Sequence, residues 1–123
     1  MQSKNILIVD DIIVNRILLI EIIKELNHTY LEAKNGKEAL EVLEKNAIDI
    51  VLMDIEMPVM NGIETTKKIR NHANEKLKNI PVIALTAHNP SDFFQNHIDV
   101  GFNDLICKPY LIDKIAHTIA KFN

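Results

Sequence analysis

Apolar residues occur along this chain in two kinds of segment, which differ in length and in period. Short continuous runs rich in β-branched residues lie at 5–9, 49–53 and 81–85, and weaker ones lie at 30–33 and 104–107. Runs of this kind are typical of strands that are buried on both faces of a parallel sheet. The pattern therefore predicts five strands.

Longer segments with helical periodicity separate these strands. We predict helices over the ranges 12–26, 37–46, 62–72, 91–99 and 111–122. In the last range, apolar residues recur at three- and four-residue spacing on one helical face. The alternation of strands and helices predicts an α/β fold of the (βα)5 type, with a parallel sheet, right-handed crossovers and helices on both faces.

The predicted strands end in polar residues. Asp10 and Asp11 follow the first strand, Asp54 the third, Thr86 the fourth and Lys108 the fifth. Open α/β sheets bind ligands beyond the carboxyl ends of their strands, at a topological switch point. We therefore expect three carboxylates, a hydroxyl and an ammonium group to meet at one edge of the sheet.

This combination of groups favours phosphoryl chemistry. Three neighbouring carboxylates repel one another, and Mg²⁺ relieves that conflict because it binds oxygen ligands and phosphate together. If the sheet order is 2-1-3-4-5, Asp54 stands at the carboxyl end of the central strand. It is then the candidate nucleophile, since carboxylates form aspartyl phosphates. Thr86 and Lys108 would stabilise charge on the phosphoryl oxygens. Asp10 and Asp11 also fit a second interpretation, as caps of the first helix.

Composition narrows the class of protein. The 123 residues match the size of a single domain, which we expect to span residues 1–123 and leave no room for another. A net charge of −3 argues against a nucleic-acid partner, and no run approaches the ~20 apolar residues of a membrane span. The single cysteine, Cys107, fits a reducing compartment. We therefore expect a cytoplasmic domain without direct membrane contact.

Four motifs together resemble the response-regulator receiver domain of two-component systems, the CheY-like family. Residues 6–11 resemble its opening strand and acidic pair, 52–62 its phosphoacceptor motif, 81–87 its fourth strand and threonine, and 108–109 its lysine–proline pair. The resemblance covers nearly the whole chain and implies a flavodoxin-like fold with the strand order 2-1-3-4-5. It implies a phosphorelay switch that takes a phosphoryl group from a histidine kinase or a histidine phosphotransfer bundle, and that catalyses only its own phosphorylation and dephosphorylation.

The resemblance also implies a role for each acid. Asp54 would accept the phosphoryl group from a phosphohistidine. Asp11 and Asp54 would bind Mg²⁺ directly, together with the main-chain carbonyl of Glu56. Asp10 would act on the metal mostly through water.

The remaining family positions include one departure. Lys108 would contact the phosphoryl group, Thr86 would bond it and move, and the peptide bond before Pro109 would be cis. The family carries an aromatic switch residue three positions before the lysine, where this chain has Leu105. We expect weaker or different coupling from Thr86 to the surface formed by the fourth helix, fifth strand and fifth helix.

Two residues are expected to flank the phosphorylation pocket, and a small residue adjoins one of them. Glu56 stands two residues after the phosphoacceptor and His88 two after the threonine, so both are expected to tune the lifetime of the aspartyl phosphate. A solvent-facing loop position is the alternative interpretation of His88. Ala87 is small and would leave the pocket open to a donor.

The first helix carries two apolar stripes. Leu18, Leu19, Ile22, Ile23 and Leu26 form one stripe, which we expect to face the sheet. A second stripe lies nearly opposite, and we predict it as a docking patch for a helical partner, unless its members are only scattered exposed residues. It consists of Ile13, Ile17 and Ile20. In the family, the first helix is where a histidine-bearing bundle docks.

Two segments of the chain indicate the kind of protein from which this domain comes. Residues 14–16 and 57–62 are similar to receivers of hybrid sensor kinases, so the chain is expected to be either such a domain or a stand-alone regulator.

A small Mg²⁺-dependent phosphatase with an aspartyl-phosphate intermediate is an alternative function, because it uses similar strand-end chemistry. It normally has a different pattern after the nucleophile and a cap domain. A flavin mononucleotide carrier is disfavoured because Asp10 and Asp11 would repel its phosphate.

Overall fold

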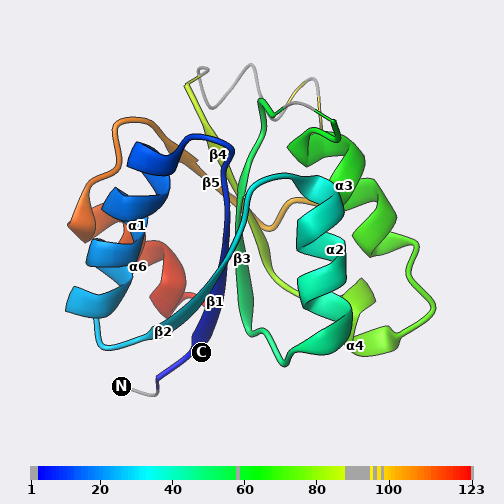
Figure 1. Ribbon diagram of the computed structural model, residues 1–123, viewed down its shortest axis with the longest axis horizontal. Coiled ribbons are helices and arrows are strands. Elements are labelled where there is room, and N and C mark those ends of the chain that lie inside the picture. The colour runs from blue at the N-terminus through cyan, green and yellow to red at the C-terminus, as the bar shows by residue number, and fades with distance from the viewer. Residues whose placement is uncertain (1–2, 58, 88–94, 96, 98, 123) are drawn as a thin grey trace.

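Five parallel strands form a single twisted sheet in the computed structural model, which describes residues 3–57, 59–87, 95, 97 and 99–122. The strand order is β2-β1-β3-β4-β5, as predicted (Figure 1). The strands are β1 (Asn5–Val9), β2 (Thr29–Ala33), β3 (Ile50–Asp54), β4 (Val82–Thr86) and β5 (Asp104–Cys107). Each lies within one residue of its predicted range at either end, which confirms the α/β fold.

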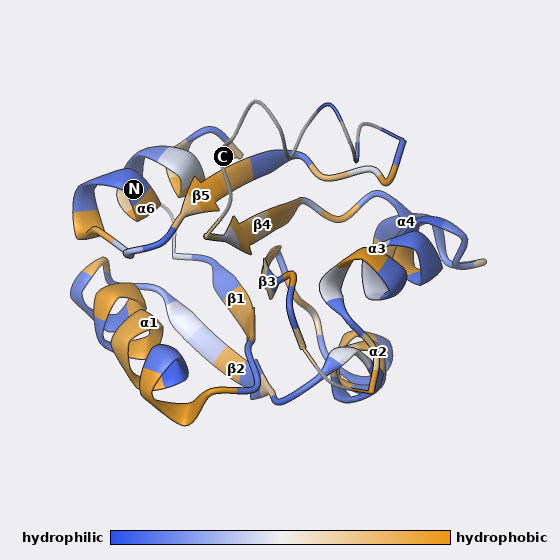
Figure 2. Ribbon diagram, turned by 90° about the horizontal axis from the view of Figure 1, so that it is seen from above, coloured by the Kyte–Doolittle hydropathy of each residue, from blue (hydrophilic) through white to orange (hydrophobic). Residues whose placement is uncertain are grey.

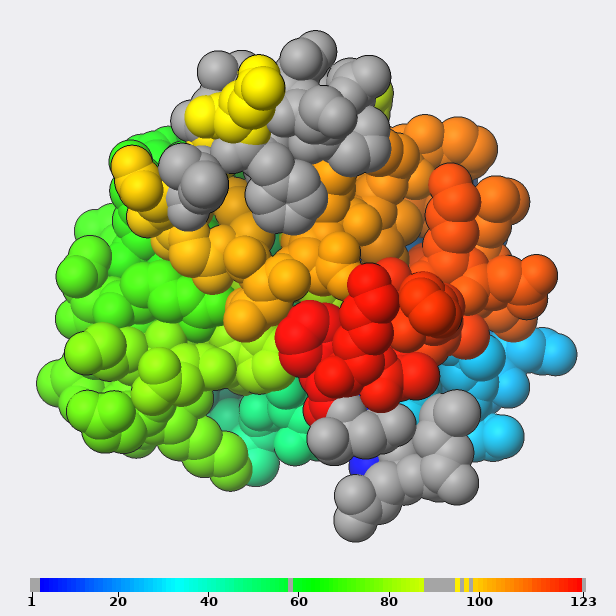
Figure 3. All heavy atoms as spheres, turned by 180° about the vertical axis from the view of Figure 1, so that it is seen from behind, coloured from blue at the N-terminus to red at the C-terminus, as the bar shows by residue number. Residues whose placement is uncertain are grey.

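Helices cover both faces of the sheet (Figure 1). α1 and α6 lie on one face and α2 and α3 on the other, and residues 100–122 occupy much of the surface seen in Figure 3. The helices are α1 (Ile13–Glu25), α2 (Gly36–Lys45), α3 (Gly62–Arg70), α4 (Glu75–Lys78) and α6 (Ile112–Ala120). The part of the chain described here contains no helix that is long and apolar enough to span a membrane.

α4 is an element that the sequence pattern did not predict. It is a single turn of four residues, too short to show helical periodicity. The Asn74 side chain starts it by accepting hydrogen bonds from the backbone N–H groups of Lys76 and Leu77. The predicted helix over 91–99 lies outside the described residues except for positions 95, 97 and 99.

The core has two halves because side chains alternate across the sheet. Ile6 and Ile8 of β1 belong to the apolar cluster shared with α1 and α6, whereas Leu7 and Val9 belong to the cluster on the α2 and α3 side. β3 and β4 are buried at every position. Burial on both faces explains why these strands read as continuous apolar runs.

The prediction for the second stripe of α1 is wrong at Ile20. This side chain is only 9% exposed and belongs to the core, whereas Ile13 and Ile17 are 61% and 53% exposed. Leu18, expected to face the sheet, is exposed. The physical reason is that α1 lies beside α6 on the same face, so one flank of the helix is buried together with its sheet-facing side (Figure 1). Figure 2 shows α1 coloured hydrophobic around much of its circumference.

Arg70 organises the edge of the sheet opposite the strand carboxyl ends. Its guanidinium donates hydrogen bonds to the carbonyl oxygens of Lys78, Ile80 and Gly101 and to the side chain of Asn103, at 2.6 to 3.0 Å. These bonds hold the segments that lead into β4 and β5. The ends of the same strands are thereby placed at the other edge, where the polar residues lie.

Candidate functional site

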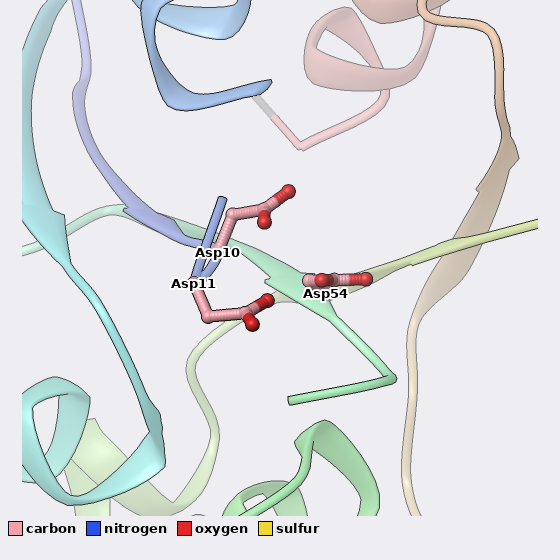
Figure 4. Close-up of side chains that lie close together, drawn as sticks. All are labelled: Asp10, Asp11 and Asp54. Carbon is pink, nitrogen blue, oxygen red and sulfur yellow. The ribbon is translucent and has the colours of Figure 1, made fainter. Parts of the chain in front are cut away.

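Three carboxylates converge at the carboxyl ends of β1 and β3 (Figure 4). β1 and β3 pair in parallel with Val9 opposite Met53, so the residues that follow come together. One carboxylate oxygen from each of Asp10, Asp11 and Asp54 lies within 4.8 Å of the other two. Asp10 and Asp54 are buried, whereas Asp11 is exposed.

The Asp54 carboxylate experiences opposing influences. Burial, and after it the negative charge of Asp10, raise the pKa of Asp54 from 3.8 to about 6, although the Lys108 ammonium works against this rise. Lys108 Nζ donates a hydrogen bond of 3.2 Å to Oδ1 of Asp54. Oδ2 of Asp54 is buried without a hydrogen-bond partner in the described part of the chain.

Asp10 shows features of both interpretations of the acid pair, as metal ligands and as caps of the first helix. Its Oδ1 accepts a hydrogen bond of 2.9 Å from the Ile12 N–H, in the turn that leads into α1. The N-cap of α1 is Ile12, so neither acid occupies the cap position itself. Oδ2 of Asp10 is buried and lacks a hydrogen-bond partner among the described residues, which leaves it able to accept from a ligand.

These donors fit a hard divalent cation. All three side chains offer carboxylate oxygens, and Asp10 and Asp54 each have a buried oxygen that lacks a hydrogen-bond partner in the described chain. An unsatisfied buried oxygen costs free energy unless a cation, a water or a donor reaches it. Mg²⁺ prefers such oxygens and keeps several waters. The chemistry of the donor set therefore matches the predicted magnesium site.

Thr86 and Lys108 reach the same edge from β4 and β5. Thr86 is the last residue of β4 and is buried. The Lys108 backbone N–H donates a hydrogen bond of 2.8 Å to the Thr86 carbonyl, and the peptide bond from Lys108 to Pro109 is cis. The structure thus brings the predicted hydroxyl and ammonium residues to the edge where the acids lie.

The other predicted site residues lie around this edge. Glu56 and Ala87 are exposed, and His88 lies outside the described residues. Leu105 is half-buried in β5, where it packs against the small cluster of Ile55 and Ala84. An aliphatic side chain therefore occupies the position of the family's switch aromatic.

Two further residues of the site were not found by reasoning from the sequence. Arg16 is a buried arginine on α1 that donates hydrogen bonds to the Asp10 carbonyl (2.8 Å) and to Glu32 on β2 (3.0 Å). Tyr110, just beyond the cis peptide bond, is 7% exposed. A charged residue within the helical pattern of α1 was the only available signal for Arg16, and no signal indicated Tyr110.

The family is decided by a match that covers almost the whole chain. A model of the response regulator receiver domain matches residues 6–120. The chain belongs to the response regulator receiver domain family.

The proteins similar to this receiver domain differ in how much longer than it they are. It is 37% identical over 121 residues to hybrid signal transduction histidine kinase A of Dictyostelium discoideum, a match covering 97% of this chain and 6% of the kinase. It is 35% identical over 122 residues to sporulation initiation phosphotransferase F of Bacillus subtilis strain 168, covering 99% of this chain and 95% of that protein. The chain thus spans only a small part of some relatives and nearly all of another.

A solved structure with the same fold holds a metal ion. It is the receiver domain of sensor histidine kinase PA1611 from Pseudomonas aeruginosa PAO1, with a magnesium ion coordinated in its active site cleft. The TM-score is 0.87 at 28% sequence identity, and the match covers 98% of each chain. The receiver domain described here is therefore a component of two-component phosphorelay signalling, and the phosphatase alternative is not favoured.

Proposed function

We propose that Asp54 is the phosphoacceptor of this receiver domain, and that the domain catalyses only its own phosphorylation and dephosphorylation. The observation that carries the proposal is the convergence of three carboxylates at the ends of β1 and β3, with Lys108 bonded to Asp54. An oxygen of Asp54 attacks the phosphorus of a phosphohistidine. The new P–O bond replaces the P–N bond, and the electron pair of the broken P–N bond goes to the imidazole nitrogen of the donor.

The charges at the site suit this transfer. Asp11, Asp54 and the main-chain carbonyl of Glu56 would hold Mg²⁺, with Asp10 acting through water. When bound, the cation supplies positive charge that screens the acids from the incoming phosphoryl group. Lys108 exchanges its bond to Asp54 for one to a phosphoryl oxygen.

The phosphoryl group then shifts a conformational equilibrium. The Thr86 hydroxyl moves toward a phosphoryl oxygen and donates a hydrogen bond to it. Leu105 stands where the family has an aromatic residue, so the coupling from Thr86 to the surface around β5 and α6 is weaker or different. Glu56, together with His88, which stands two residues after Thr86 in the sequence, sets how readily water reaches the aspartyl phosphate. The small Ala87 leaves the pocket open to a donor.

Mass spectrometry tests the proposal on the wild-type chain. Incubation with a small phosphodonor and Mg²⁺ is expected to add the mass of one phosphoryl group, which hydroxylamine removes as it does from an acyl phosphate. Borohydride reduction followed by peptide mapping is expected to place the modification at Asp54. A label at any other residue, or labelling that is unaffected by chelation of Mg²⁺, contradicts the assignment.

We infer that the partner is the histidine-bearing helical bundle of a kinase or phosphotransfer protein, in the cytoplasm, and that the chain is either a receiver of a hybrid sensor kinase or a stand-alone regulator. The supporting observation is the apolar surface at the start of α1, beside the acids. Ile13 and Ile17 lie there, and Ile20 is excluded by its burial. Other exposed apolar side chains of the region are Ile12, Val14, Leu18, Leu111 and Ile112. An apolar helix face next to a reactive site suits a helical partner.

Replacing Ile13 and Ile17 together with serine is expected to slow phosphotransfer from the bundle by roughly 30-fold, since interface residues that matter cost over ~1 kcal/mol each when truncated, or about 2 kcal/mol for the pair. Stopped mixing with a phosphorylated phosphotransfer protein that is active on the wild type measures this rate. Phosphorylation by a small donor is the internal control and stays unchanged, because Asp54 is untouched. An equal fall for both donors contradicts docking at this surface.

A further inference from the structure

Tyr110 places a phenol hydroxyl in the interior next to the metal-binding carboxylates. The side chain is 7% exposed, and its ring belongs to the same apolar cluster as Ile8 of β1 and Leu52 of β3. Each of these strand residues stands two positions before an acid of the site, Asp10 or Asp54. The ring therefore packs beneath the strand ends that carry the acids.

Three residues at this end of the sheet each have a buried oxygen without a hydrogen-bond partner in the described chain. These oxygens are Oη of Tyr110, Oδ2 of Asp10 and Oδ2 of Asp54. A phenol can donate one hydrogen bond, and an ionised carboxylate can only accept. Oδ1 of Asp10 already accepts from the Ile12 N–H, so Oδ2 is the oxygen that remains for a donor. The donor and the acceptor complement each other.

The electrostatics agree with this pairing. Burial raises the pKa of the Tyr110 phenol, and the negative charges of Asp10 and Asp54 and an interaction with the Asp10 side chain raise it further. The hydroxyl is thus within reach of Asp10, although the two groups do not have the geometry of a formed hydrogen bond. The phenol remains a protonated donor.

Packing alone does not explain the hydroxyl. Phenylalanine would fill the same apolar cluster without burying a polar atom, and an unsatisfied buried hydroxyl costs free energy. A structural role therefore predicts that the protein tolerates or even benefits from loss of the hydroxyl. A role at the site predicts that loss of the hydroxyl changes metal binding.

We propose that Tyr110 is a positioning residue whose hydroxyl, when Mg²⁺ binds, turns to donate a hydrogen bond to Oδ2 of Asp10 and so holds that carboxylate in place for the metal. The inference rests on the proposed function, in which Asp10 contacts the metal through water. With Oδ1 bonded to Ile12 and one lone pair of Oδ2 bonded to Tyr110, the other lone pair of Oδ2 stays available to a metal-bound water. Groups that orient metal ligands in this way typically change affinity by about 10- to 100-fold.

Magnesium titration of the Tyr110→Phe variant tests the proposal, and the chain offers a matched control. Its only other tyrosine is Tyr30, half-buried in β2 away from the acids. Calorimetric titration with Mg²⁺ is expected to give a dissociation constant about tenfold higher for Tyr110→Phe than for the wild type. Tyr30→Phe is expected to keep the wild-type value.

A spectroscopic measurement separates positioning from packing. The chain has no tryptophan, so the tyrosine absorption and emission of Tyr30→Phe come from Tyr110 alone. Adding Mg²⁺ is expected to shift this signal, whereas the Tyr110→Phe protein, which retains Tyr30, is expected to show no shift. Urea unfolding without Mg²⁺ is expected to show Tyr110→Phe at least as stable as the wild type.

The outcomes distinguish the inference from the function on which it rests. If the wild type binds Mg²⁺ and is phosphorylated but Tyr110→Phe binds Mg²⁺ equally well, the inference alone is overturned. A Tyr110→Phe protein that is destabilised while its Mg²⁺ affinity is unchanged shows a packing role and overturns it too. If the wild type binds no Mg²⁺ and takes up no phosphoryl group, both the proposed function and the inference fail.

Discussion

Asparagine in place of Asp54 is expected to abolish phosphoryl uptake and, in the metal-free protein at pH 7, to raise the free energy of unfolding by about 2 kcal/mol. The loss of uptake follows because an amide cannot act as the nucleophile. The gain in stability follows because the Asp54 carboxylate is 1% exposed and lies beside Asp10. Asparagine is nearly isosteric and removes the buried charge.

The stability gain should depend on pH in a defined direction. The pKa of Asp54 is raised from 3.8 to about 6, mainly by burial. Between these values the folded protein keeps a proton that the unfolded chain releases, so the folded state loses stability as the pH rises from about 4 to 6. The difference between Asp54→Asn and wild type is therefore expected to be fully present above about pH 6 and absent below about pH 4.

Urea unfolding at pH 4, 6 and 7 with a chelator, alongside mass spectrometry after small-donor treatment, measures both effects. Glu41→Gln is the matched control, because Glu41 is an exposed acid on α2. It should phosphorylate normally and change stability by less than about 0.5 kcal/mol. Phosphoryl uptake by Asp54→Asn, or a variant less stable than wild type at pH 7, contradicts the view of Asp54 as a reactive carboxylate whose buried charge destabilises the fold.

Alanine at Gly62 is expected to lower the free energy of unfolding by about 3 kcal/mol, the upper part of the range for overpacking, and to weaken Mg²⁺ binding. A Cβ at Gly62 would collide with the carbonyl oxygen of Asp54 and would lie 2.9 Å from Cα of Ile55. These are backbone atoms and cannot rotate away. The Gly62 N–H also donates a hydrogen bond of 3.0 Å to the Ile55 carbonyl, which closes the loop that contains Glu56. Displacing this loop moves Asp54 and the proposed Glu56 carbonyl ligand together.

Gly101→Ala separates the local effect from a general loss of stability. Gly101 has a φ of +103°, which alanine adopts only with strain, and a Cβ there would lie 3.0 Å from the Arg70 side chain. It lies at the opposite edge of the sheet from the acids, so it is expected to lose about 1–3 kcal/mol of stability without a change in Mg²⁺ affinity. Urea unfolding and calorimetry on both variants provide the comparison. If Gly62→Ala leaves Mg²⁺ affinity intact, the loop does not position a ligand.

Strand positions and their chemistry were predictable because they depend on local patterns. The five apolar runs are long enough to read as buried strands, and each active group follows the strand that presents it. Asp10, Asp54, Thr86 and Lys108 are therefore predictable as neighbours once the strands are known to be parallel. The single turn Glu75–Lys78 was not predictable in this way, because four residues show no period and Asn74 starts the turn through its own side chain.

The environment of the site was not predictable from the sequence, because it depends on contacts between residues far apart in the chain. No local pattern shows that the Tyr110 hydroxyl, Oδ2 of Asp10 and Oδ2 of Asp54 are each buried without a hydrogen-bond partner in the described chain, or that Arg16 donates a hydrogen bond to the Asp10 carbonyl. The same holds for Ile20. A helix with apolar residues on two sides has two candidate inner faces, and only the element beside it selects between them.

The sequence by itself determined the (βα)5 architecture, the strand that carries each polar group and the membership of the receiver family. The reason is that buried strands, and the polar residues at their ends, can be recognised from short stretches of sequence. Only the tertiary structure decided which apolar side of α1 is buried, how far the Asp54 pKa is raised and that the Tyr110 hydroxyl is buried without a hydrogen-bond partner in the described chain. Burial, charge proximity and hydrogen bonding act over a few ångströms in space, whatever the separation along the chain.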